Sequence, residues 1–183
     1  MLPLLLGAAA LLSFAPIDTA TSRSIVGSPT VGHTPVVGIR SVLVADSIVV
    51  EKEKHTLSLY QAGFLVRTYR VALGRDPVGD KVRIGDNRTP EGLFHIDYKN
   101  PQSKYHMALH ISYPDAAHEA RARAAGVAAG GDIMIHGLPS AYADLGEKHA
   151  NYDWTEGCIA VTNAQIEEIW RAIPRGAPIQ IKP

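Results

Sequence analysis

The chain has 183 residues, of which 46% are apolar and 20% are charged, and its 18 basic residues are balanced by 18 acidic ones. This length and composition are typical of one folded globular domain and argue against a disordered or fibrous chain. Because the net charge is zero and the sequence contains no Lys/Arg block, we do not expect a nucleic acid partner.

The N-terminus differs in composition from the rest of the chain. Apolar and small residues run unbroken over 2–14 (LPLLLGAAALLSF), and small and polar residues follow to position 24. The run is short for a membrane span but has the length of a signal-peptide hydrophobic region, although no Lys or Arg precedes it. We therefore expect residues 1–22 to be a signal peptide or an N-terminal anchor, with a buried N-terminal helix as the alternative. Residues 23–45 are rich in Gly, Pro, Ser and Val without a helical period, which indicates a linker or arm.

Short strands are expected along the remainder of the chain, residues 46–183. Segments rich in β-branched and aromatic residues predict strands at 46–50, 56–60, 64–73, 93–98, 105–113 and 178–182. The three residues 61–63 form a plausible hairpin turn, and 74–92 reads as a long loop with Asp, Asn, Pro and Gly. In 105–113 the alternation places Tyr105, Met107, Leu109, Ile111 and Tyr113 on one face.

Two helices are also expected. Asp115 can cap a helix that follows Pro114 and continues to about residue 126. Thr162 and Gln165 form a capping-box pattern, and apolar residues at 166, 169, 170 and 173 then share one helical face. Many short strands and two short helices, without regular strand–helix alternation, favour a mainly β sandwich or barrel over a doubly wound sheet.

The sequence contains a single cysteine, Cys158, so an intramolecular disulfide is impossible. Taken alone it has two interpretations, a small buried apolar residue or a nucleophile. His136, which is followed by Gly137, lies 22 positions before Cys158. A thiol attacks a carbonyl as its thiolate and needs a base beside it, and a histidine held by a glycine turn at a strand end suits that role. Gly157 lets the backbone approach Cys158, so that nearby amides could hold an oxyanion.

Two separate motifs carry a resemblance to a known family. The first is Gly85–Phe94 (GDNRTPEGLF), and the second combines His136-Gly137 with Thr155–Cys158 (TEGC). In this order they resemble the catalytic domain of L,D-transpeptidases (YkuD-type), over residues 46–183. Several independent motifs agree, which favours the catalytic interpretation of Cys158.

The resemblance implies an L,D-transpeptidase catalytic fold and a reaction on peptidoglycan. In that reaction Cys158 attacks the carbonyl at the L-centre of diaminopimelate in a stem tetrapeptide and releases D-alanine. His136 takes the thiol proton, the Gly137 carbonyl orients the imidazole, and Gly157, Thr155 and Glu156 belong to the nucleophile motif. The acyl group then passes to an amine or to water. No metal or organic cofactor is implied.

By the same resemblance, the partners are peptidoglycan stem peptides, with a cell-envelope lipoprotein as a further acceptor or substrate. The protein is then expected to be exported to the periplasm or cell envelope and to serve wall biogenesis and cell shape.

The chain departs from the family pattern at two positions. Glu156 replaces the usual histidine before the Gly-Cys pair, and Ala160 replaces the usual arginine after it; both changes disfavour a thiolate. The 22-residue spacer is long, which indicates an inserted loop at 141–151. A family subgroup with small residues at the arginine position includes enzymes that hydrolyse instead of cross-linking. Three functions therefore stay open: transfer, which we favour, hydrolysis by the same Cys–His pair, and an inactive wall-binding module.

Other side chains are weaker candidates. Arg88, His110 and Ser112 are expected to contact substrate, against the alternatives of loop packing and a solvated strand face. His106 and His110 lie four positions apart on a strand, about 13 Å, which is too far to share one metal ion. Tyr142 and His149 fall in the inserted loop, where they could form a lid, and Trp154 could pack or stack.

Overall fold

The structure, a computed structural model, describes residues 43–183. The predicted signal peptide or anchor (1–22) lies outside the described residues, and so does nearly all of the predicted arm (23–45). Over the described range, no helix combines the length and the apolar character needed to cross a membrane.

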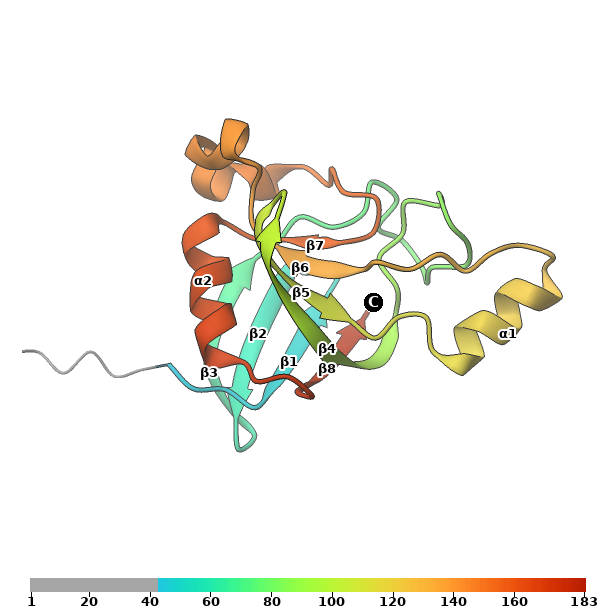
Figure 1. Ribbon diagram of the computed structural model, residues 1–183, viewed down its shortest axis with the longest axis horizontal. Helices are drawn as coiled ribbons and strands as arrows, with labels where there is room; N and C mark the ends of the chain where they lie inside the picture. The colour runs from blue at the N-terminus through green and yellow to red at the C-terminus, as the bar shows by residue number, and fades with distance from the viewer. Residues whose placement is uncertain (1–42) are drawn as a thin grey trace, which may run out of the picture. The chain divides into compact units, whose positions relative to one another are not determined.

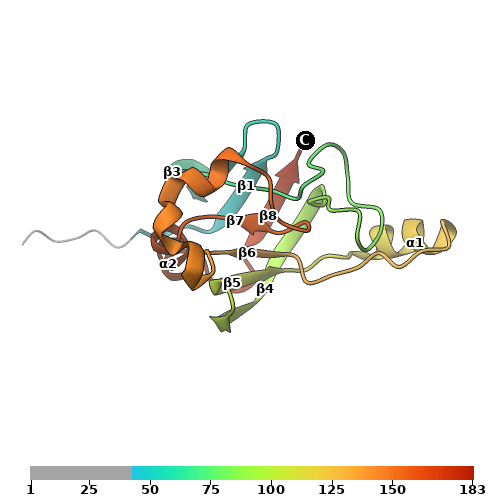
Figure 2. The same ribbon diagram turned by 90° about the horizontal axis from the view of Figure 1, so that it is seen from above.

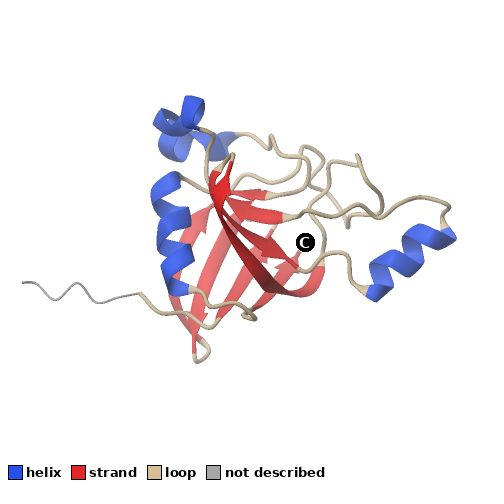
Figure 3. Ribbon diagram, in the orientation of Figure 1, coloured by secondary structure: helices blue, strands red, loops and turns tan. Residues whose placement is uncertain are grey.

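Within residues 43–183, eight strands form one mixed sheet (Figures 1 and 3). The strands are β1 (Ser47–Glu51), β2 (Thr56–Gln61), β3 (Phe64–Arg70), β4 (Gly92–Ser103), β5 (His106–Ile111), β6 (Met134–His136), β7 (Ile159–Ala160) and β8 (Pro178–Lys182). Their spatial order is β3-β2-β1-β8-β4-β5-β6-β7. The pairs β1–β8 and β6–β7 are parallel, and the other neighbours are antiparallel.

The sheet curls until its two ends meet. Ala72, just beyond β3, exchanges two backbone hydrogen bonds of 3.1 and 2.9 Å with Ala160 of β7. Gly74 and Thr155 form a second bridge next to the first. The curvature is visible when the molecule is seen from above (Figure 2). The predicted mainly β, barrel-like fold is therefore confirmed, with the edges joined next to Cys158.

Alternating residues of the strands form the core. Ile48 and Val50 of β1 are buried and pair with Ile179 and Ile181 of β8, which are buried as well. The same period of two places Leu109, Ile135 and Ile159 in one buried row across β5, β6 and β7. Burying a side chain of this size contributes roughly 2 kcal/mol, so these rows hold the strand register.

Both predicted helices are present. α1 (Ala116–Ala124) begins after Asp115, whose carboxylate accepts a hydrogen bond from the His118 backbone N–H. It projects from the sheet, as Figure 1 shows. α2 (Asn163–Ala172) begins after Thr162 with the predicted capping box to Gln165, and it packs against β5 and β6 with Ile166 and Ile169 buried.

The structure adds the short strands β6 and β7 to the predicted elements, and among its other differences from them three are the largest. The expected strand 64–73 ends at Arg70, because the backbone of 71–74 leaves β2 to pair with β7 and its preceding loop. The expected strand 93–98 extends through Pro101 to Ser103, since the long hairpin with β5 tolerates an irregularity there. The expected loop 141–151 forms η1 (Ser140–Asn151), two 3₁₀ segments joined at Gly146, whose φ of 50° lies outside the helical region.

Candidate active site

Cys158 and His136 lie on neighbouring strands and on one face of the sheet. His136 is the last residue of β6 and pairs with Ala160 of β7. Two residues before His136, Met134 pairs with His110 of β5. The parallel register of β6 and β7, continued back by the same two residues, places Met134 beside Cys158, which comes just before β7. Registered residues of paired strands point to the same face, and so do residues two positions apart. His110, His136 and Cys158 therefore share a face, with Cys158 diagonal to His136.

The imidazole of His136 is held in one tautomer. Its Nδ1 atom lies 2.7 Å from the Gly137 carbonyl oxygen, and a carbonyl oxygen only accepts hydrogen bonds. Nδ1 therefore carries the hydrogen, which leaves the lone pair of the neutral ring on Nε2. Burial lowers the pKa of His136 to about 4, against the opposing effect of the Gly137 hydrogen bond and with a small contribution from His149. At neutral pH the ring is uncharged, and no hydrogen bond from residues 43–183 occupies Nε2, which can accept a proton.

Two aromatic rings enclose His136. The Tyr105 ring lies 4.4 Å from the imidazole centroid at an interplanar angle of 34°, and the Trp154 ring lies 5.7 Å away at 66°. These contacts fix the plane of the imidazole and cover it from solvent. Trp154, for which packing and stacking were both open, therefore lies edge-on against His136. Tyr105, expected on the same strand face as Leu109 and Ile111, which are buried, instead contacts His136 and is 39% exposed.

The Cys158 side chain is half-buried and its thiol faces the backbone. Sγ lies 3.5 Å from the Asp132 carbonyl oxygen, and no hydrogen bond joins it to His136 within residues 43–183. Burial raises the pKa of the thiol; the Met134 backbone N–H and Lys81 lower it, and Asp132 and then Glu156 raise it. The resting pair is therefore a neutral thiol and a neutral imidazole, as the predicted loss of thiolate character implied.

This order of influences gives a test of the electrostatics. Asp132 affects the thiol more than Glu156 does, although Glu156 is closer in sequence. Glu156 is 81% exposed and lies 3.8 Å from Arg75. Removing either charge should lower the thiol pKa, since a nearby carboxylate disfavours the thiolate. We expect Asp132→Asn to move the pH midpoint of iodoacetamide alkylation downward, and Glu156→Gln to move it less. A larger shift in E156Q, or an upward shift in D132N, would contradict the arrangement.

Thr155 and Gly157 shape the turn that leads into Cys158. The Thr155 hydroxyl donates to the Cys158 carbonyl at 2.7 Å and accepts from the Gly157 N–H at 3.1 Å. The Gly157 amide is thus already hydrogen-bonded and is not free to hold an oxyanion, contrary to the simplest reading of the motif. Gly157 has a φ of +133°, and a Cβ there would lie 2.6 Å from the Arg88 carbonyl oxygen. The turn needs glycine for both reasons.

A pair of glycine variants separates these two reasons. Gly85 also has a positive φ, +74°, but a Cβ there would meet nothing within 4 Å. We expect Gly85→Ala to cost about 1 kcal/mol of unfolding free energy through backbone strain alone. Gly157→Ala adds a clash with fixed backbone and should cost about 3 kcal/mol or more. Denaturant unfolding measures the loss of unfolding free energy in each variant. Equal losses in the two variants would show that the backbone at Arg88 moves to accommodate the added methyl group without cost.

The comparisons with known proteins show the family of the chain. Residues 45–181 match the L,D-transpeptidase catalytic domain (YkuD), which is most of the chain. The chain belongs to this family. A curated relative, "Putative L,D-transpeptidase YafK" of Escherichia coli (strain K12), is 29% identical over 128 residues, covering 67% of this chain and 44% of the relative. The chain therefore spans less than half the length of the curated relatives it matches.

Solved structures share the fold of this L,D-transpeptidase domain. The helical cell shape determining protein Pgp2 of Campylobacter jejuni aligns with a TM-score of 0.56 and 24% identity, covering 79% of this chain and 51% of Pgp2. Bd1075 of Bdellovibrio bacteriovorus aligns with a TM-score of 0.52 and 21% identity, covering 76% of this chain and 51% of Bd1075.

The upstream motif of the L,D-transpeptidase domain builds the loop that supports Cys158. Asp86 accepts hydrogen bonds from Lys81 and from the backbone of Val82, Arg83 and Arg88. Burial alone would raise the pKa of Asp86, but these hydrogen bonds outweigh it and lower the pKa to about 2. Thr89 is fully buried, and its hydroxyl accepts from the Gly74 N–H at 3.0 Å. This motif therefore positions the backbone against which Gly157 packs.

The three predicted substrate contacts differ in their surroundings. Arg88 places its carbonyl against Gly157, but its guanidinium pairs with Asp76 at 2.9 Å. The Ser112 hydroxyl is engaged by His95, through the backbone N–H at 3.0 Å and the ring at 2.9 Å. Of the three, His110 is the one whose strand register brings it into the row of Cys158.

The segment expected as a lid lies next to the imidazole. Tyr142 of η1 is 60% exposed, whereas His149 is buried, and neither ring nitrogen of His149 has a partner within the described residues. Burial lowers the pKa of His149, and nearby Arg70 lowers it further. His149 is thus a neutral packing residue near His136, and its burial could not be predicted from the sequence.

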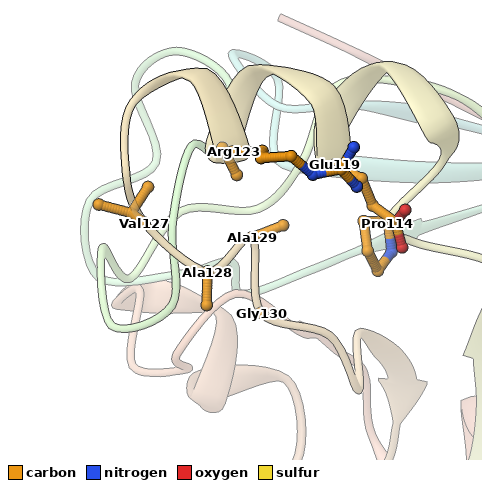
Figure 4. Close-up of a pocket in the computed structure, with 8 residues that line it drawn as sticks. Pro114, Glu119, Arg123, Val127, Ala128, Ala129 and Gly130 are labelled. Carbon is orange, nitrogen blue, oxygen red and sulfur yellow. The ribbon is translucent and has the colours of Figure 1, made fainter.

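The described residues also include a hollow and two carboxylate-paired histidines. A hollow of about 480 Å³ lies between α1 and residues 127–130, with Glu119 and Arg123 on its wall (Figure 4). In the described range, no three His, Cys, Asp or Glu side chains are grouped as metal ligands would be. His106 pairs with Glu167 at 2.8 Å and His110 with Asp97 at 2.7 Å, so the two histidines face different partners.

Proposed function

We propose that this L,D-transpeptidase domain forms an acyl-enzyme between Cys158 and a peptidoglycan stem peptide. The observation that carries the proposal is the neutral His136 imidazole, whose Nε2 lone pair is free on the strand next to the thiol. A thiol that is protonated at rest needs such a base at the moment of attack. No cofactor is needed for this chemistry.

The proposed first step cleaves the bond before D-alanine in a tetrapeptide stem. His136 Nε2 takes the Cys158 proton while Sγ attacks the carbonyl carbon at the L-centre of diaminopimelate. Since Thr155 occupies the Gly157 N–H, we assign the developing oxyanion to the Cys158 backbone N–H, the amide covalently closest to the sulfur. Gly137 keeps the imidazole in the required tautomer.

The acyl group then passes to an amine, which gives a cross-link, or to water, which gives a tripeptide. Ala160 is fully buried and carries no charge, so it supplies no anchor for the acceptor's carboxylate. Hydrolysis is therefore the second candidate. Transfer remains the leading proposal, and it rests on the family to which the domain belongs.

The cellular setting is also proposed. A substrate in the wall requires export, so we infer that the protein acts in the periplasm or cell envelope after residues 1–22 direct it there. Stem peptides are the proposed partners, and a cell-envelope lipoprotein is a further candidate acceptor or substrate.

Incubating the protein with tetrapeptide stems as donor and acceptor tests the proposal. Transfer predicts cross-linked dimers with one D-alanine released per link. Tripeptide monomers without dimers, even at high acceptor concentration, would assign hydrolysis instead. Unchanged peptides that nevertheless bind to the protein would identify an inactive wall-binding module and refute the proposed enzyme.

A further inference from the structure

His110 and Asp97 form a histidine–carboxylate pair beside the thiol. His110 Nδ1 lies 2.7 Å from Asp97 Oδ1, and because a carboxylate only accepts, Nδ1 donates its hydrogen to it. The Tyr98 ring stacks on the imidazole, 4.4 Å away and 15° from parallel. The His110 side chain is only 12% exposed. One ring nitrogen, Nε2, remains available for proton exchange.

A β-bulge produces this pair. The ladder between β4 and β5 runs from the pair Ile96–Ile111 directly to the pair Tyr98–His110, so Asp97 is an extra residue in β4. A bulge redirects the side chain of its extra residue, and bulges are frequent next to active sites. Here the bulge allows Tyr98 to stack on His110 while Asp97 reaches its Nδ1. Two side chains of one strand thus orient a single imidazole.

The free nitrogen of His110 faces the neighbourhood of the thiol. His110, Met134 and Cys158 follow one another across adjacent strands, which puts the outer two Cα atoms about 10 Å apart. Asp132 lies between them: its Oδ1 is 3.9 Å from His110 Nε2, and its carbonyl oxygen is 3.5 Å from Cys158 Sγ. A single nitrogen or oxygen atom can be about 2.9 Å from both Nε2 and Oδ1. Asp132 thus connects the two groups, since its side chain faces His110 and its backbone carbonyl faces the thiol.

We propose that His110, oriented by Asp97, exchanges the proton of the amine that leaves the substrate and of the amine or water that replaces it. The exposed Asp132 carboxylate accepts a second hydrogen from the same atom. His136, two residues beyond Met134 on β6, serves the thiol. This inference rests on the proposed acyl-transfer function and assigns its second proton-transfer group.

The protons balance over one cycle that begins with a proton on each ring nitrogen of His110. In acylation His136 Nε2 takes the thiol proton and passes it to water, the Sγ–C bond forms, and the C–N bond breaks as the departing nitrogen takes the proton of His110 Nε2. In resolution the incoming amine or water bonds to the carbonyl carbon and returns a proton to His110 Nε2. The C–S bond then breaks, and Sγ takes a proton from water through His136.

Two acyl donors separate the roles of the histidines. A tetrapeptide releases an amine, which needs a proton, whereas a thioester of the tripeptide releases a thiolate, which does not. For His110→Gln we expect tetrapeptide acylation to fall by about 10²-fold or more, and thioester acylation to proceed at the wild-type rate. The resulting acyl-enzyme should persist about 10²-fold longer, with or without an amine acceptor. Hydroxylamine, which attacks without help from a base, should release it at the wild-type rate.

His106→Gln is the matched control. His106 lies on the same strand and also pairs with a carboxylate, that of Glu167, so this variant should behave as the wild type in both assays. Asp97→Asn keeps the imidazole and should slow resolution about 10-fold, which provides a test should H110Q fail to fold. Wild-type resolution in H110Q, or in D97N if only that variant folds, overturns the role of His110 while acylation of Cys158 still supports the proposed function. A wild-type protein acylated by neither donor overturns both.

Discussion

Replacing Cys158 by serine is expected to lower D-alanine release from a tetrapeptide stem by on the order of 10⁴-fold or more. The serine hydroxyl is a far weaker acid than a thiol. The base beside it is a buried imidazole, and burial lowers the pKa of His136 to about 4. Such a base cannot remove the proton of an alcohol effectively. Release of D-alanine, measured by liquid chromatography and mass spectrometry, gives the rate.

The serine variant should keep its fold. The Cys158 side chain is half-buried, and its hydrogen bond to the Asp132 carbonyl is one that a hydroxyl can also make. We therefore expect a change of no more than about 1 kcal/mol in unfolding free energy. Activity that survives in a folded C158S protein would mean that another side chain is the nucleophile.

Replacing His136 by asparagine should lower acylation of Cys158 by about 10³-fold. An asparagine side-chain N–H can still donate to the Gly137 carbonyl, so the variant removes Nε2 with little change to the turn. The thioester donor is the right probe, because its leaving group needs no proton and the rate then reports removal of the thiol proton alone. The H106Q variant is again the control, because His106 is a histidine of β5 that pairs with Glu167.

The wild-type pH profile should carry the signature of the same group. His136 accepts a proton only when it is neutral, and its pKa is lowered to about 4. Acylation should therefore persist as the pH falls from 7 to about 5 and be lost only as the pH passes through about 4. An acid limb near the ordinary histidine value of about 6.5 would show that His136 is solvated or that another histidine is the base.

The sequence predicted a candidate nucleophile and base, and the structure places Cys158 and His136 on one face of neighbouring strands. The local signals were strong: a capping box at Thr162, a glycine beside each of the two candidate residues, and a strand ending at His136. These local signals could not predict which strands pair or in which register. The contact between residues 72 and 160 closes the sheet, and a bridge between segments so far apart leaves no local pattern.

The charges that shift the thiol pKa could not be predicted from the sequence either, because they too depend on contacts between segments far apart in the chain. Glu156 is two positions from Cys158 and was the obvious charge, but it points to Arg75 and solvent. Asp132, 26 positions away, has the larger effect because β6 starts beside it and its carbonyl contacts the sulfur. The aromatic enclosure of His136 arises in the same way, from Tyr105 on one side and Trp154 on the other.

The most direct test of the account is the mass of the protein during its reaction with a tetrapeptide stem. We predict an adduct equal to the tripeptide acyl group, formed with release of one D-alanine per protein and located by peptide mapping on Cys158. The adduct should be absent in C158S and should disappear when hydroxylamine is added, as a thioester does. An unmodified Cys158 in a protein that nevertheless releases D-alanine would contradict the central claim.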